Sequence, residues 1–135
     1  MTYVNEYLYD GETVCIGRKG TIDRPFYHDG KIWTVDTLFF THSFVEVVPR
    51  FLAYKFEQVD WLSYNEATGV PSLTSKAIED VVITVPTTLA EQKAIAKVLG
   101  DMDEEIAALE AELAKTRQLK QGMMQELLTG KTRLV

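Results

Sequence analysis

The chain has 135 residues and a formal charge of −6 at pH 7, which allows one compact domain and an additional long helix but not two full hydrophobic cores. The negative balance argues against a protein that binds nucleic acid through a bulk positive field. The single cysteine excludes a disulfide framework within one chain, and the sequence has neither an apolar run of membrane-spanning length nor a secretion leader. We therefore expect a cytoplasmic protein that makes no contact with a membrane.

Residues 1–86 predict an α+β domain with a small, mostly antiparallel sheet. The first dozen residues are mixed in character and could supply an edge strand. Further short strands are expected at 13–16, 24–27, 31–35, 38–41 and 45–48. The dipeptide Asp29-Gly30 predicts a hairpin turn between the strands at 24–27 and 31–35. Cys15 lies in the apolar run 13–16, where a buried strand thiol is favoured over a nucleophile or a metal ligand.

Helical signals follow these strands. Pro49 fits the first position of a helix over about 50–59, because its missing amide hydrogen costs nothing there. Residues 65–71 are expected to form a loop, and Thr74 or Ser75 opens a short helical turn. The β-branched run 81–85 then predicts a buried strand.

One long amphipathic helix is predicted over residues 89–128. Its apolar residues recur at alternating spacings of three and four, which is the 3.5-residue repeat of a coiled-coil seam. Eight of the ten seam residues are apolar and two, Thr116 and Lys120, are polar; the ten are Ile95, Leu99, Met102, Ile106, Leu109, Leu113, Thr116, Lys120, Met123 and Leu127. Thr88 and Glu91 form a capping box at the start, and Gly130 supplies a left-handed residue just past the end. We therefore assign residues 87–135 to a helical module that follows the domain.

Charge is segregated along this module. Residues 87–112 carry seven acidic and two basic side chains, whereas residues 113–135 carry five basic side chains and one acidic side chain. Two such helices would bring opposite charges together if they ran antiparallel and like charges together if they ran parallel. The helix macrodipole explains part of this polarity within a single helix. We favour antiparallel self-pairing over parallel pairing or a foreign partner.

The segment 17–21 is the first candidate for binding chemistry. Gly17 and Gly20 free the backbone for positive φ and close approach, while Arg18, Lys19 and Thr21 offer two charges and a hydroxyl to phosphates. The spacing is not that of a P-loop. The alternative interpretation is a basic turn exposed to water.

The segment 69–76 is the second candidate. Here Ser72, Thr74 and Lys76 lie near a predicted helix start, and helix capping is the alternative to phosphate binding. We find no serine–histidine–aspartate set, no cysteine–histidine set and no metal-ligand spacing. We therefore expect a protein that is not an enzyme and holds neither a metal nor another cofactor.

The order of several segments resembles a known family. These segments are Ile16-Gly17-Arg18-Lys19-Gly20-Thr21-Ile22, Trp33-Thr34-Val35-Asp36-Thr37-Leu38, Gly69-Val70-Pro71-Ser72-Leu73-Thr74, Val85-Pro86 followed by Leu89-Ala90-Glu91-Gln92-Lys93-Ala94-Ile95, and the tail from Lys120 to Leu134. Over about residues 13–135 the chain resembles the specificity subunit of type I restriction-modification systems. The resemblance is to the C-terminal part of a target-recognition domain and the conserved helical region after it.

The resemblance implies a non-catalytic protein that reads a bipartite double-stranded DNA sequence, with helix length acting as the ruler between half-sites. It also implies docking of an adenine-N6 methyltransferase subunit, which holds S-adenosylmethionine, and of a restriction subunit in the full complex. By the same pattern, Arg18 and Lys19 would contact phosphates, and the loops that carry Gly20, Thr21, Ser72, Thr74 and Lys76 would face DNA.

Two departures from the family pattern leave alternatives open. Asp23 stands where the family usually has glycine, and the chain holds one helix and less than one whole recognition domain. A half-subunit can restore the missing helix by homodimerising, which is our leading hypothesis. The alternative is a truncated remnant or fragment that serves only as a helical assembly module and binds no DNA.

Overall fold

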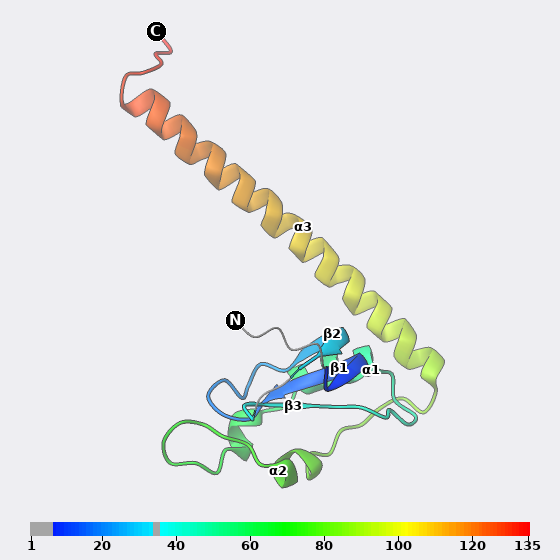
Figure 1. The fold of residues 1–135 in the computed structure, drawn as a ribbon. Coiled ribbons are helices and arrows are strands. Elements are labelled where there is room, and N and C mark those ends of the chain that lie inside the picture. Colours follow the sequence, from blue (N-terminus) through cyan, green and yellow to red (C-terminus); the bar gives the residue numbers. More distant parts are fainter. Residues whose placement is uncertain (1–6, 34–35) are drawn as a thin grey trace. The chain divides into compact units, whose positions relative to one another are not determined.

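Strand β1 is the centre of a three-stranded antiparallel sheet of order β2-β1-β3 in the computed structural model, which describes residues 7–33 and 36–135 (Figure 1). The strands are β1 (Tyr9–Gly17), β2 (Phe26–Ile32) and β3 (Leu38–Phe40). The centre of β1, from Thr13 to Ile16, is buried on both faces. The structure thus confirms the predicted strands at 13–16 and 38–41 and the buried thiol of Cys15.

Three short helical elements complete the domain. They are α1 (Pro49–Glu57), the 3-10 helix η1 (Trp61–Tyr64) and α2 (Ser75–Glu79). Pro49 stands in the first turn of α1, and Thr74 caps α2, as predicted. The core gathers Val14, Ile16, Ile22, Leu52, Ala53, Phe56, Trp61 and Leu73.

Trp61 is the largest buried side chain of this core. Its ring meets that of Phe56 edge-on at 5.4 Å between centroids. Its indole Nε1 donates a hydrogen bond of 2.8 Å to the Phe56 carbonyl, so the one polar atom of the ring is satisfied. This pair fixes η1 against the end of α1.

The hairpin predicted at Asp29-Gly30 is wrong. Both residues lie inside β2, where Asp29 pairs with Glu12 and Gly30 pairs with Gly11 of β1. Gly11 and Gly30 therefore face each other in the ladder, and both have positive φ values, +142° and +118°. The local turn preference is overridden because β2 gains a continuous ladder with β1. Of the predicted strand at 31–35, residues 34 and 35 lie outside the described residues, as do most residues of the suggested edge strand.

The strands predicted at 45–48 and 81–85 are also wrong. Glu46 has a φ of +55°, which breaks an extended run, and Val48 serves instead as the N-cap residue of α1. Val82 is 89% exposed, and residues 81–85 join none of the ladders in the described part of the chain. Apolar β-branched sequence alone does not supply the neighbouring strand that a ladder requires.

Helix α3 (Leu89–Leu128) has the bounds that the sequence predicted. The Thr88 Oγ1 accepts a bond of 3.3 Å from the Glu91 amide, which is one half of the predicted capping box. Gly130 follows the helix with a φ of +73°. The α+β class, with a small antiparallel sheet and one long C-terminal helix, is confirmed.

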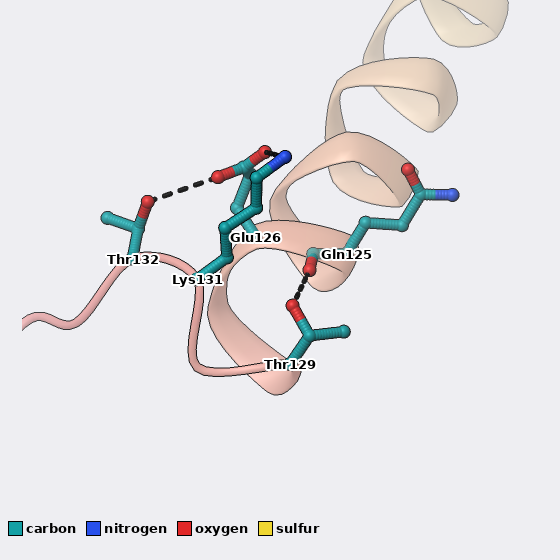
Figure 2. Close-up of polar contacts among 5 residues, drawn as sticks. All are labelled: Gln125, Glu126, Thr129, Lys131 and Thr132. Carbon is teal, nitrogen blue, oxygen red and sulfur yellow. Dashed lines mark hydrogen bonds and ion pairs between the residues drawn. The ribbon is translucent and has the colours of Figure 1, made fainter.

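The end of α3 is closed by its own tail (Figure 2). The Glu126 carboxylate accepts a hydrogen bond of 3.1 Å from the Thr132 hydroxyl and forms an ion pair of 3.4 Å with Lys131 Nζ. The Thr129 hydroxyl donates to the Gln125 carbonyl. The two contacts of Glu126 hold the residues after Gly130 against the last helical turn, and the Thr129 bond satisfies a backbone carbonyl group that a helix end leaves open.

The chain forms two compact units, which divide within α3 between Ala96 and Lys97. The first two turns of α3 therefore belong to the unit that contains the sheet, and the rest of the helix with its tail forms the second unit. No helix in the described ranges combines the length and the apolar character that crossing a membrane requires.

Candidate nucleic-acid interface

The connection that leaves β1 is shaped by its two glycines. A Cβ placed on Gly17 would lie 1.9 Å from the Thr21 carbonyl oxygen, so only glycine fits at this point. Gly20 has a φ of +89°, which side chains of L-residues disfavour. Ile22 is fully buried and anchors the far end of the loop in the core. Residues 18–21 are left exposed at the surface.

The structure joins the two predicted binding segments. Lys19 and Ser72 form an isolated antiparallel bridge. On either side of it, the Gly20 amide donates to the Pro71 carbonyl and the Leu73 amide donates to the Arg18 carbonyl, each at 2.8 Å. Segments that lie about fifty residues apart in the sequence therefore form one short ribbon. Sequence reasoning named both segments but did not predict that they touch.

Asn65 holds the base of the second segment. Its Oδ1 accepts hydrogen bonds of 3.0 Å from the Ala67 amide and from the Ser72 amide. Its Nδ2 donates to the Ala67 carbonyl at 3.1 Å. Sequence reasoning missed this role, although asparagine at a loop start is a known signal for side-chain bonds to the following backbone.

Arg18 is held from two directions. Its amide donates to the Thr37 carbonyl at 2.8 Å, and its guanidinium lies 5.4 Å from the centre of the Phe39 ring. Lys19 is exposed. Within the described ranges, neither Arg18 nor Lys19 takes part in an ion pair with an acidic side chain. Both positive charges are therefore open to an external anion.

The other members of the second segment have structural contacts. The Thr74 Oγ1 accepts a bond of 3.2 Å from the Ala77 amide and so caps α2. Lys76 forms an ion pair of 3.5 Å with Asp80, and both side chains are mostly exposed. These are the contacts of the helix-capping alternative. Contact of Ser72, Thr74 and Lys76 with DNA stays a prediction.

The seam residues of α3 form an open apolar stripe. Met102, Ile106, Leu109, Leu113 and Met123 are each between 46% and 57% exposed. Thr116 and Lys120 are exposed, whereas Ile95, Leu99 and Leu127 are half-buried. A stripe of large apolar side chains in water favours a partner that covers it, and its pairing stays a prediction.

Cys15 offers no reactive group at this surface. Burial raises the pKa of its thiol, an effect that a hydrogen bond with the Thr13 side chain partly opposes. Among the described residues, no group of three or more histidine, cysteine, aspartate or glutamate side chains is placed to hold a metal ion.

The structure thus combines two surface loops joined in a short ribbon, a small antiparallel sheet and a 40-residue helix. Residues 1–120 match the family described as the type I restriction modification DNA specificity domain, and the chain belongs to that family. The type I restriction enzyme MjaVIII specificity subunit of Methanocaldococcus jannaschii is 28% identical to the chain over 125 residues. That alignment covers 90% of this chain but only 27% of the relative, so the chain spans about a quarter of that protein's length.

Proposed function

We propose that the chain is a DNA sequence-recognition half-subunit of a type I restriction-modification complex. The observation that carries the proposal is the Lys19–Ser72 bridge, because it puts the two segments that the family pattern assigns to DNA on one surface. Membership of the specificity-domain family supports the same role. The chain itself would supply no catalytic group.

The charge of the domain requires that DNA contact be local. Residues 1–86 carry seven basic and twelve acidic side chains, which gives a formal charge of −5 (7 − 12). A bulk field therefore repels the duplex, and affinity has to come from the unpaired cations on the ribbon. Arg18 and Lys19 would bind phosphates and set the register of the protein on the duplex, and backbone amides of the two loops would add to them.

Dimerisation through α3 would supply the second half-site. A lone helix cannot bury a stripe that is about half exposed at five positions, whereas a second copy can cover it with the same stripe. The acidic half of one helix would then face the basic half of the other in an antiparallel pair. Two recognition domains would be held apart on one duplex by this helical spacer.

The remaining partners of this proposal are those that the family resemblance implies. The dimer would dock an adenine-N6 methyltransferase subunit that holds S-adenosylmethionine, and the full complex would add a restriction subunit. In this assembly the chain contributes position and sequence choice, and the methyltransferase contributes chemistry.

Salt dependence of duplex binding tests the proposal. Each phosphate contact contributes about 0.9 to the slope of log affinity against log salt. Two cations on each of two half-subunits therefore predict a slope of roughly −3 to −4 for the dimer or its methyltransferase complex, measured by fluorescence anisotropy. Absence of duplex binding by either species would contradict the proposal.

A second candidate function is a helical assembly module without DNA affinity. The charge of −5 on residues 1–86 and the position of Asp23 just after the loop favour it. It predicts dimerisation and methyltransferase docking with no measurable binding of any duplex. The same titration therefore separates the two functions.

A further inference from the structure

Gln92 is a buried polar side chain at the start of α3. It is 0% exposed, and Thr13 and Gln92 are the buried polar residues of the part of the chain that the structure describes. A buried amide is tolerated when its donors and acceptor are all bonded. The burial of Gln92 therefore requires hydrogen-bond partners for its amide group.

The amide of Gln92 joins three stretches of chain. Its Oε1 accepts a bond of 2.8 Å from the Val48 amide. Its Nε2 donates to the Glu46 carbonyl at 3.1 Å and to the Pro86 carbonyl at 2.9 Å. Both donor hydrogens and the acceptor are used, so a single side chain ties α3 to the segment before α1 and to the segment before α3 itself.

The segment before α1 needs such a bond. Ser43 and Glu46 both have positive φ values, +58° and +55°, without being glycine. Val48 is the N-cap residue of α1, yet its side chain makes no capping bond. The Gln92 amide group bonds the Val48 amide and the Glu46 carbonyl of this strained segment. The same bonds hold the first turn of α3 against the segment.

Gln92 continues the spacing of the predicted seam toward the start of α3. It stands seven residues before Leu99 and three before Ile95, so the 3-4 spacing extends back to it. Ala96, one turn further on, is buried as well. At its start the stripe of α3 is therefore occupied by the chain's own domain, and only later seam residues are open to a second helix.

We propose that Gln92 is a positioning residue that fixes the first two turns of α3 to the recognition domain and thereby sets the spacing of the half-sites that a dimer reads. The inference rests on the proposed function. Because an α-helix propagates as a stiff rod, the bonds that hold its first turns determine how sharply the separation of two domains is defined. Loss of the amide group would leave the Lys19–Ser72 ribbon of each protomer intact. It would let the distance between the two half-sites vary.

The test is binding of the full-length dimer to duplexes that carry two half-sites at stepped spacings. Gln92→Met keeps the length of the side chain and removes all three bonds, and Gln121→Met, at an exposed position of α3, is the matched control. Wild-type protein and the control should prefer one spacing by about tenfold or more over a spacing one base pair longer, whereas Gln92→Met should prefer it by less than about threefold. Affinity for a single half-site should be unchanged in all three.

The outcomes are distinct. If Gln92→Met keeps the spacing preference of wild type, the inference is overturned while the proposed function stands. If wild type binds no duplex, the proposed function fails instead. A second variant, Gln92→Glu, keeps an acceptor for the Val48 amide and loses both donated bonds, so it decides the matter if the methionine variant does not fold. It should broaden the preference too, and a preference as narrow as that of wild type would overturn the inference.

Discussion

The α-carbon of Gly17 faces the backbone carbonyl of Thr21 so closely that a Cβ at position 17 would lie 1.9 Å from the carbonyl oxygen. The oxygen belongs to the backbone next to the fully buried Ile22, so it has little room to move. We predict that Gly17→Ala lowers the free energy of unfolding by about 2 kcal/mol or more, the usual cost of forcing atoms into a packed region. Urea denaturation with an unchanged slope measures it.

The matched control for this substitution is Gly69→Ala. No atom lies within 4 Å of a Cβ built at Gly69, so its free energy of unfolding should stay within about 0.5 kcal/mol of wild type. Equal stabilities of the two alanine variants would mean that the loop after β1 does not have the described shape.

Reversal of the ribbon charges should weaken DNA binding without regard to sequence. In the double variant Arg18→Glu and Lys19→Glu, two cations that are free of acidic partners in the described residues become anions facing phosphates. Affinity should fall for every duplex, because phosphate contacts position the protein and carry no sequence information. Lys93→Glu, at an exposed position in the acidic half of α3, is the control. A loss confined to one target sequence would show that these side chains read bases instead.

A charge in the middle of the seam should separate the dimer. Leu109 is 57% exposed in the single chain and would be buried against a second helix. We predict that Leu109→Lys shifts the protein to monomer in sedimentation equilibrium, since an unpaired buried charge is costly. Ala111→Lys adds the same charge two residues away, off the stripe, and should leave the mass unchanged. An identical mass for both variants would place the interface elsewhere.

The Cys15 thiol should be protected in the folded protein. Because burial raises its pKa above the ordinary value of 9.0, the unfolded chain loses this proton at a lower pH than the folded chain does. The folded state then binds more protons, so stability is full below pH 9.0 and falls as pH rises above it. A thiol reagent at pH 8 should label Cys15 only in unfolded protein, so labelling should become rapid when denaturant is added. Rapid labelling of native protein would contradict the burial of β1.

The long helix could be predicted with its approximate bounds because its signals are local. Thr88 caps it, Gly130 follows its last turn, and the alternating three-four spacing runs between them, with Thr116 and Lys120 as polar seam positions. The strands were harder to predict, since a ladder depends on a partner that is distant in sequence. Asp29-Gly30 has the composition of a turn, yet pairing with Gly11 and Glu12 keeps it within β2.

The candidate site could be predicted only in parts. The glycine segment and the Pro-Ser-Leu-Thr segment can be recognised from their own residue types. The bridge between Lys19 and Ser72 cannot, because it joins segments that only the fold brings together. The role of Gln92 could not be predicted, because it acts on backbone atoms of a segment distant in sequence, whereas Asn65 at a loop start is a local signal that could have been read. Distant backbone partners leave no trace in side-chain composition.

The hydrogen bonds of Asn65 divide the loop at residues 65–72 into a fixed base and an exposed tip. One side-chain oxygen fastens residues 67 and 72, while Thr68, Gly69 and Val70 between them are exposed. Residues at this tip can be exchanged or inserted without breaking these hydrogen bonds. Changes at residues 68–70 would therefore leave the Asn65 bonds and the sheet domain beneath them in place.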